Sequence, residues 1–276
     1  MVEAKPKSKR RSAPKDGVGK VDRQLVQIYR TAEDYRRYTW ENADRRRALA
    51  SFYKKYRRFF GRSVLDLGCG GGVLGITLER SGRSYLGVDA NPDMIREARK
   101  AANEKGSSQR FQMGDICRAR IPGRFDTVAL LGNSLAHINV EDMDELLRAR
   151  KANVHVGSTF VVDYRDLVAM FWSGSWSRVK IQTHVRGKVV HRTRVLDLEE
   201  GRLRMRARPG SGKWRLDWAH AIWSPFILEA VMRRHDWRLL ARSPRHGKSV
   251  TTSIPEHIVE VYRLERRQAP ARPARN

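Results

Sequence analysis

Apolar and polar positions follow two different periods along the middle of the chain. Short apolar runs, typical of strands buried on both faces, alternate with stretches that have the 3.6-residue period of helices. The pattern predicts a parallel sheet with helices on both faces, an α/β, doubly wound (Rossmann-like) fold. The predicted strands are 63–67, 84–88, 109–112, 125–131 and 158–163, and the predicted helices are 72–81, 92–104 and 141–152.

After residue 175 the period changes to two, which is typical of half-buried strands. Glycine-containing turns separate these alternating stretches, so we expect an antiparallel β insertion at about 176–220. A further helix is predicted at 224–236, followed by two closing strands at 237–242 and 257–265. The whole pattern therefore predicts a seven-stranded, mostly parallel sheet with an inserted antiparallel sheet. The strands predicted in the insertion are 178–185, 188–197, 202–208 and 213–219.

The two ends of the chain differ from this domain. Residues 1–20 and 266–276 are basic, carry Pro with Ser, Gly or Ala, and lack periodicity, which predicts disordered tails. Residues 25–59 are aromatic and charged at helical spacing, so we expect N-terminal helices that lead into the first strand. The predicted domain then extends from residue 21 to 265.

The composition excludes several classes of protein. Cys69 and Cys117 are the only cysteines and have no paired spacing, which excludes a disulfide scaffold or a zinc finger, and we expect no metal. No apolar run is long enough to span a membrane, and no apolar segment follows the basic N-terminus as in a secretory signal. We therefore expect a cytoplasmic protein without a membrane partner. The pattern does not specify an oligomeric state.

The net charge of +26 is spread over the whole chain. Residues 1–20 carry +5 and residues 263–276 carry +4, so +17 falls on the residues between them. A basic surface attracts nucleic acid or small anionic substrates. A solvated, arginine-rich surface has the same composition, so charge alone does not choose between these readings.

The first predicted strand runs into the glycines of V64-L-D-L-G-C-G-G-G-V-L-G75. This stretch contains G-x-G-x-x-G, and Asp89 stands about 20 positions further on, as in dinucleotide-binding proteins. Asp66, however, lies inside the strand end, where its carboxylate would repel a pyrophosphate at the next helix N-terminus. A cationic ligand would be attracted instead. The stretch therefore favours S-adenosylmethionine, whose amino group and sulfonium are positive.

Three blocks in this order resemble the class I S-adenosylmethionine-dependent methyltransferases: V64-L-D-L-G-C-G-G-G, G87-V-D-A-N-P-D-M94 and F111-Q-M-G-D-I116. The resemblance implies that Asp89 holds the ribose, that Met94 packs on the adenine, and that Asp115 with the Ile116 main chain reads the adenine amino group. The cofactor contacts that it implies are Asp66, Gly68, Cys69, Gly70, Gly72, Asp89, Ala90, Met94, Asp115, Ile116 and Leu131. Independently, Asn91 is predicted to cap the following helix, with Pro92 at its first position.

Further blocks resemble the glycine and sarcosine N-methyltransferase group. They are L131-G-N-S-L-A-H-I138, V161-V-D-Y-R-D166 and the stretch from Trp214 to Met232. This resemblance implies that Asn133 and Arg165 hold the substrate. It also implies that Tyr38 and Arg45 reach the site from the N-terminal helices, Tyr38 as a substrate contact and Arg45, or one of the two arginines after it, as a cofactor contact. Trp218 and Ala219 depart from the group, which has tyrosines there.

The predicted reaction is methylation of a small carboxylated amine such as glycine or sarcosine. The enzyme must present a neutral lone pair in line with the methyl carbon. Arg165 would anchor the acceptor carboxylate through two parallel hydrogen bonds, and Asn133 would hold the other end. His137 would take the amine proton, since an imidazole titrates near neutral pH. The alternative for His137 is a structural role.

The basic insertion suggests RNA as an alternative methyl acceptor. Four arginines alternate with apolar residues over 202–208, and a strand places such residues on one face. That face would dock RNA phosphates, with Trp214 or Trp218 stacking a base. The competing interpretation is an exposed face whose charge Asp217 and Glu199 balance.

Overall fold

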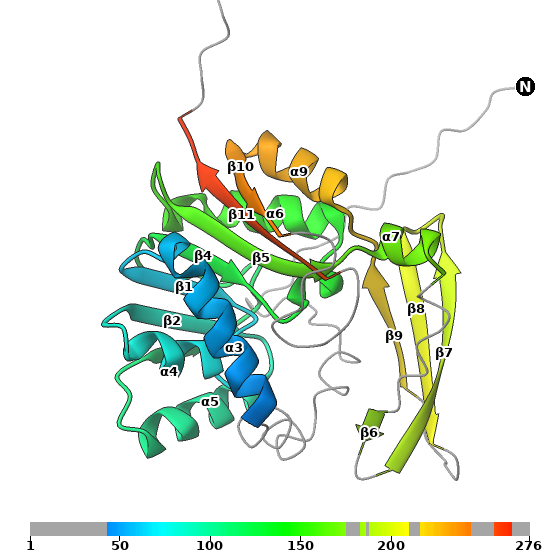
Figure 1. The fold of residues 1–276 in the computed structure, drawn as a ribbon, viewed down its shortest axis with the longest axis horizontal. Coiled ribbons are helices and arrows are strands. Elements are labelled where there is room, and N and C mark those ends of the chain that lie inside the picture. The colour runs from blue at the N-terminus through cyan, green and yellow to red at the C-terminus, as the bar shows by residue number, and fades with distance from the viewer. Residues whose placement is uncertain (1–42, 175–182, 186–187, 210–215, 244–256, 267–276) are drawn as a thin grey trace, which may run out of the picture.

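A computed structural model of the chain describes residues 43–174, 183–185, 188–209, 216–243 and 257–266. Its main sheet has seven strands in the order β10-β11-β5-β4-β1-β2-β3 (Figure 1). Neighbouring strands are parallel except where β11 pairs with β5 and with β10. The strands are β1 (Ser63–Leu67), β2 (Ser84–Asp89), β3 (Arg110–Met113), β4 (Thr127–Leu130), β5 (Thr159–Arg165), β10 (Trp237–Arg242) and β11 (His257–Leu264).

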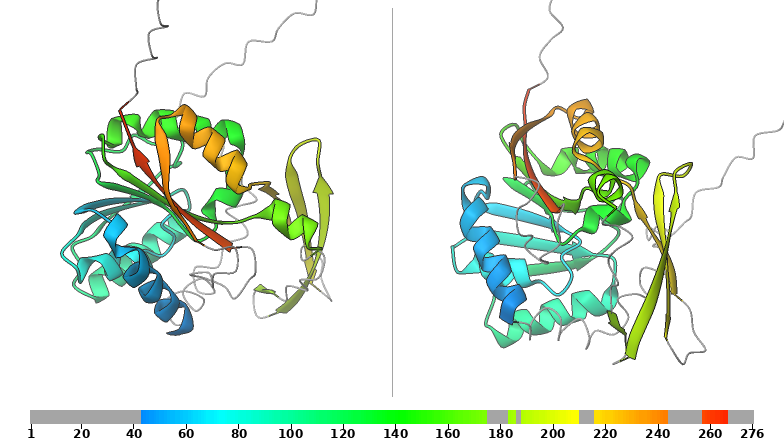
Figure 2. Two further views of the ribbon diagram at one scale, coloured as in Figure 1. Left: turned by 45° about the horizontal axis from the view of Figure 1, so that its top comes forward. Right: turned by 45° about the vertical axis from the view of Figure 1, so that its right-hand side comes forward.

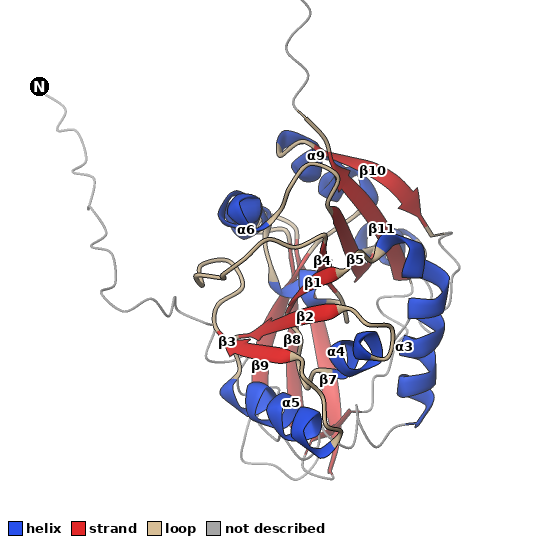
Figure 3. Ribbon diagram, turned by 90° about the vertical axis from the view of Figure 1, so that its left-hand side faces the viewer, coloured by secondary structure: helices blue, strands red, loops and turns tan. Residues whose placement is uncertain are grey.

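Helices cover both faces of this sheet, with α3 and α4 on the side opposite α6 (Figure 3). Because β1, β2, β4 and β5 are parallel, their C-terminal ends lie along one edge. The loops that leave this edge form the site described below. The helices and short 3₁₀ helices are α3 (Ala43–Tyr56), η2 (Arg57–Phe59), α4 (Val73–Glu79), α5 (Pro92–Glu104), η3 (Ser134–His137), α6 (Val140–Arg150), η4 (Lys151–Asn153), α7 (Leu167–Trp172) and α9 (Pro225–Arg234).

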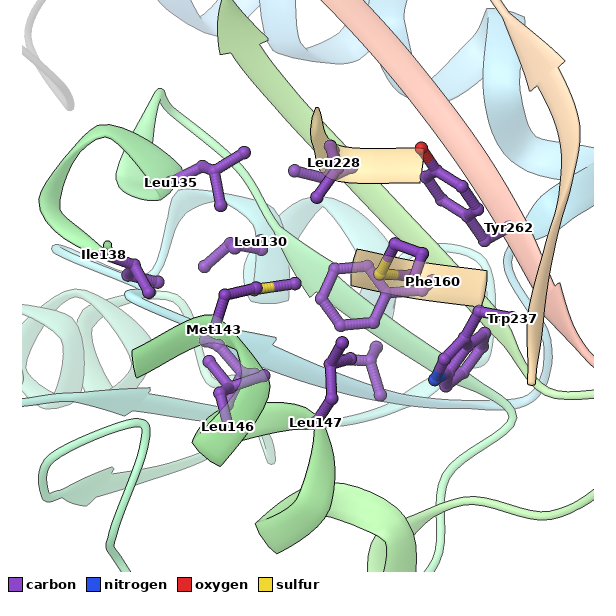
Figure 4. Packing of buried hydrophobic residues seen from close by; sticks show 14 of the residues in the cluster. Leu130, Leu135, Ile138, Met143, Leu146, Leu147, Phe160, Leu228, Trp237 and Tyr262 are labelled. Carbon is purple, nitrogen blue, oxygen red and sulfur yellow. The ribbon is translucent and has the colours of Figure 1, made fainter. Parts of the chain in front are cut away.

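Two apolar cores sandwich the sheet. On one face, α3, α4 and α5 pack against β1 and β2 around Phe52, Leu78 and Phe111. On the other face, α6 and α9 pack around Phe160, Met143 and other buried side chains (Figure 4). Burial of this apolar surface is the main term that stabilises the sheet and therefore its C-terminal edge.

A second sheet of four antiparallel strands has the order β6-β7-β8-β9. It stands beside the main sheet, next to α7, in every view (Figures 1 and 2). The strands are β6 (Thr183–Val185), β7 (Lys188–Asp197), β8 (Arg202–Pro209) and β9 (Leu216–Ala221). The chain enters this sheet after β5 and α7 and returns from it to α9, as the change of period predicts.

The fold class predicted from the sequence is confirmed, including the seven strands and the inserted sheet. Several elements begin and end as expected, such as β1 and α5. The structure adds η3 and α7, which the pattern did not predict, since each is too short to show a helical period. The domain limits remain predictions, because 1–42 and 267–276 lie outside the described residues. No helix in the described ranges is both long and apolar enough to cross a membrane.

Candidate active site

The loop after β1 bends sharply at the C-terminal edge of the sheet. Gly68 has φ +76° and Gly72 has φ +77°, a left-handed conformation that favours glycine. The amides of Gly68 and Cys69 both donate to the carbonyl of Val88, at 2.8 and 3.1 Å, which fastens the loop to β2. A Cβ on Gly68 would lie 2.9 Å from Ser134 Oγ. Glycine is therefore required at both positions by the main-chain conformation, and at Gly68 also by the close approach of Ser134.

Asp66 lies beneath this bend and is buried, with 4% of its surface exposed. The Tyr85 hydroxyl donates to Asp66 Oδ2 at 2.7 Å. Burial raises the pKa of Asp66 to about 7; the Tyr85 bond opposes the rise, and the charges of Asp89 and Asp163 add to it. A buried carboxyl of this kind favours a cationic partner, because a nearby positive charge stabilises its ionised form.

Asp89, at the end of β2, joins two loops of the site. The amide of Gly70 donates to Oδ2 and the amide of Asn91 donates to Oδ1, each at 2.9 Å. Burial raises the pKa of Asp89, and these amide bonds act in the opposite direction. Each carboxylate oxygen has more than one acceptor position, so the pair of amides orients the group and leaves capacity for ligand hydroxyls.

The helix that follows Asp89 is capped as the sequence predicts. The side chain of Asn91 accepts from the amides of Asp93 at 2.9 Å and Met94 at 3.4 Å, and Pro92 is the first helical residue. The cap holds the loop that carries Asp89. The prediction for Asn91 is confirmed.

The remaining cofactor candidates lie around the same edge. Asp115 Oδ1 accepts from the amide of Cys117 at 2.8 Å, and its Oδ2 pairs with Arg118 at 3.1 Å. Met94 is buried, whereas Ala90, Ile116 and Leu131 are partly exposed. Tyr38 lies outside the described residues, and the side chain of Arg45 is likewise outside the described part. The role of each residue toward the cofactor remains a prediction.

The end of β4 is tied to the end of β5. Asn133 has φ +64°, rare for a residue other than glycine. Its amide donates to Asp163 Oδ1 at 3.1 Å, and its side-chain oxygen accepts from the amide of Arg165, also at 3.1 Å. Asp163 is fully buried and lies 3.8 Å from the Nε2 atom of His257, itself buried on β11. Burial lowers the pKa of His257.

A small pocket lies between this edge and the inserted sheet. Asn133 and Arg165 both line it, so the structure brings these two sequence-predicted residues together. His137 is not among the residues that line the pocket; its ring packs edge-on against His220, with the ring centroids 5.0 Å apart. The pocket is lined by Asn133, Ala136, Tyr164, Arg165, Leu167, Met170, Leu203, His220, Ala221 and Trp223.

Sequence reasoning missed His220. It stands on β9, inside the stretch from Trp214 to Met232 that carries the resemblance, yet nothing in its spacing sets it apart. Its partner His137 is more than 80 positions earlier, and only the fold brings the two together. A polar residue within an otherwise apolar strand face was the one available signal.

Comparison with known proteins agrees with this architecture. The family model described as "Methyltransferase domain" matches residues 64–155. A crystal structure of an S-adenosylmethionine-dependent methyltransferase from Clostridium acetobutylicum has a TM-score of 0.64 at 18% identity. It covers 87% of this chain and 99% of that chain. The match extends the likeness in fold beyond the residues of the family model.

Two curated relatives act on different acceptors. The ribosomal protein L11 methyltransferase of Thermosipho africanus is 27% identical over 147 residues, 50% of this chain and 55% of that protein. The glycine/sarcosine N-methyltransferase of Parasynechococcus marenigrum is 29% identical over 127 residues, 45% of each. The chain thus spans about half the length of each. Residues 64–155 thus match a methyltransferase domain, and over 87% of its length the chain has the fold of an S-adenosylmethionine-dependent methyltransferase.

Proposed function

We propose that this protein transfers a methyl group from S-adenosylmethionine to the nitrogen of a small carboxylated amine such as glycine or sarcosine. The observation that carries the proposal is the position of Arg165, which lines a small pocket at the edge that bears the glycine bend. A guanidinium there can hold a carboxylate by two hydrogen bonds. Both cysteines are free, which suits the cytoplasm as the place of this activity.

The donor site fits S-adenosylmethionine on two structural grounds. The Gly70 amide of the bend holds the Asp89 carboxylate beside it, at 2.9 Å. Asp66 supplies a buried carboxylate whose ionised form a cation would stabilise. Asp89 and the Asp115 loop would hold the nucleoside. When bound, S-adenosylmethionine supplies an electrophilic methyl group; the protein orients the acceptor toward it and excludes water.

The described arginines of the insertion do not favour RNA as the acceptor. Arg204 pairs with Asp197 and with Glu200, each at 2.9 Å, and Arg202 lies 3.9 Å from Glu200. Both arginines flank the buried Leu203, which lines the pocket, so period-2 alternation turns them to the opposite face. Arg206 and Arg208 lie in the same strand, and their side chains are outside the described part.

The test is a screen of the full chain with radiolabelled S-adenosylmethionine against glycine, sarcosine and bulk tRNA. We expect transfer to at least one amine, a loss of roughly 100-fold or more in kcat/KM for Arg165→Ala, and partial activity for Arg165→Lys. Arg148→Ala is the control, since Arg148 pairs with Asp144 on the exposed side of α6. Transfer to tRNA alone would refute the proposal.

A further inference from the structure

His220, on β9 of the inserted sheet, lines the small pocket that also contains Asn133 and Arg165. This pocket, which we propose holds the methyl acceptor, is called the acceptor pocket below. In the register of β8 and β9, Leu203 lies directly opposite His220, and directly paired residues project from the same face of a sheet. Leu203 is 4% exposed and lines the same pocket. The face with Leu203 and His220 therefore closes the pocket over the edge of the main sheet. It places an imidazole on the side facing Arg165.

Trp223 holds this part of the insertion against the main sheet. Its indole N–H donates to the carbonyl of Ile138 at 2.8 Å, and its carbonyl accepts from the amide of Leu167 at 3.1 Å. Trp223 itself is 1% exposed. Ile138 directly follows η3, and Leu167 comes two residues after Arg165. The two bonds thus set the distance between β9 and both walls of the pocket.

His137 lies next to the pocket without lining it. Its ring meets that of His220 at 5.0 Å between centroids and an interplanar angle of 82°, an edge-to-face arrangement. η3, which carries His137, follows the Asn133 turn directly. His137 is therefore placed to orient the His220 ring, and His220 is placed to meet a ligand.

We propose that His220 accepts the proton of the acceptor's ammonium group, and that His137 is a positioning residue that holds the His220 ring. This inference rests on the proposed function and adds the residue that readies the acceptor. An amino acid at neutral pH carries its nitrogen as an ammonium, which has no lone pair for attack. Transfer of one proton to an unprotonated ring nitrogen of His220 leaves a neutral amine held by Arg165.

The balance of the step is simple. His220 gains one proton and one positive charge, the acceptor nitrogen becomes neutral, and the proton later passes to solvent. The nitrogen lone pair then forms the new N–C bond, and the methylated nitrogen takes over the positive charge; the bond from the methyl carbon to sulfur breaks, and its electron pair stays on sulfur, which leaves S-adenosylhomocysteine with a neutral thioether. No further reactant is needed.

The first experiment compares the pH dependence of kcat/KM for sarcosine and glycine in three variants. We expect His220→Gln to lower kcat/KM roughly 100-fold at neutral pH. Its pH profile should also lack the limb in which kcat/KM rises as the imidazole deprotonates. His137→Gln should retain more activity and shift that limb. His155→Gln is the matched control, since exposed His155 pairs with Asp126 outside the site; its profile should equal that of the unchanged protein.

Two readouts separate proton transfer from mere packing. Added imidazole should restore part of the activity of His220→Gly and none of that of Arg165→Ala. The second readout is an NMR titration of the histidine rings with S-adenosylhomocysteine bound. The His220 signal is identified by its absence in His220→Gln. Sarcosine should shift the pH midpoint of the His220 ring and leave that of His155 unchanged. Calorimetry should show S-adenosylmethionine affinity within about twofold of the unchanged protein for His220→Gln.

The outcomes are distinguishable. If His220→Gln keeps the rising limb and nearly full kcat/KM while Arg165→Ala is inactive, the inference on His220 is wrong and the proposed function stands. An unshifted His220 ring in the unchanged protein would also refute the inference, even if the variants fail to fold. If the unchanged protein methylates none of the amines, the proposed function fails and the role of His220 fails with it.

Discussion

The side-chain oxygen of Asn133 accepts a hydrogen bond from the main-chain amide of Arg165 at 3.1 Å. Asn133 follows β4 and Arg165 ends β5, so this bond joins the C-terminal ends of two neighbouring strands. The Asn133 amide makes a second tie, to Asp163. A residue that resemblance assigns to substrate binding therefore also sets the position of the arginine beside it.

Substitution of Asn133 separates these two roles. Asn133→Gly removes the side-chain bond and keeps the left-handed φ of +64°, so we expect a loss of about 1 kcal/mol in unfolding free energy. Asn133→Ala also strains the main chain and should lose roughly 1–2 kcal/mol more. Both should raise KM for the acceptor.

Urea denaturation and steady-state kinetics measure these effects. Asp236, with φ +65°, provides the control, because Asp236→Ala should be less stable than Asp236→Gly while neither changes KM. Equal stability of the two Asn133 variants would show that its main-chain conformation carries no strain.

Asp66→Asn should change stability in a pH-dependent way. The pKa of Asp66 in the folded chain, about 7, lies above its ordinary value of 3.8, so the folded chain binds the proton more tightly. The stabilisation that this proton gives is complete below pH 3.8 and is lost as pH rises through 7. The neutral amide of the variant avoids that loss. As pH rises between these values, the unfolding free energy of the variant should therefore increase relative to that of the unchanged protein, by a few kcal/mol at most.

Denaturation at pH 5 and pH 8 tests this expectation. Asp126→Asn is the contrast and should lose stability at both pH values, because hydrogen bonds from Ser63 and His155 outweigh desolvation and lower the pKa of Asp126, so that this carboxylate is ionised at pH 5 and at pH 8. Despite its greater stability, Asp66→Asn should bind S-adenosylmethionine more weakly. A stability difference that is the same at both pH values would contradict the assigned pKa.

The helix cap at Asn91 links stability to donor binding. Asn91→Ala should cost about 1 kcal/mol, because the amides of Asp93 and Met94 lose their acceptor. Asn139→Ala is a matched control, since Asn139 caps α6 by accepting from the amide of Asp142 at 2.7 Å, away from Asp89. Both variants should lose similar stability, and only Asn91→Ala should weaken S-adenosylmethionine binding in calorimetry. Equal affinity of the two variants for S-adenosylmethionine would show that the Asn91 cap does not contribute to binding at this site.

Gly68→Ala should impair the donor site by a steric route. The new Cβ would lie 2.9 Å from Ser134 Oγ, and the φ of +76° adds strain of roughly 1–2 kcal/mol. Gly82→Ala has a similar φ of +69° and nothing within 4 Å of its Cβ, so it reports the strain alone. We expect lower stability in both and loss of S-adenosylmethionine binding only in Gly68→Ala. Binding retained by Gly68→Ala would show that the bend does not contact the ligand.

Much of the main sheet could be read from the sequence because its signals are local. β1 and α5 have the predicted limits, since an apolar run and an Asn91-Pro92 cap each define an element over a few residues. The positions of the glycine bend, Asp66 and Asp89 could be predicted for the same reason, because they stand in one short region; their roles toward a cofactor remain predictions.

The acceptor side could be predicted only in part. η3 and α7 are too short to show a period, so their positions depend on packing against distant strands. The contact between His137 and His220, and the bond from Trp223 to Ile138, join segments about 85 residues apart. A left-handed φ at Asn133 also has no pattern in the sequence, since it is stabilised by Asp163 on another strand.

The two hydrogen bonds of Trp223, to Ile138 and Leu167, bear on how mutation can change the binding properties of this protein. Every residue assigned to the donor comes from the chain before the insertion, whereas one wall of the pocket comes from β8 and β9, joined to the rest through a few bonds. Mutations on that wall should therefore change the proposed acceptor site without replacing any residue assigned to the methyl donor. The proposed choice of acceptor could then change by mutation while the proposed donor site stays the same.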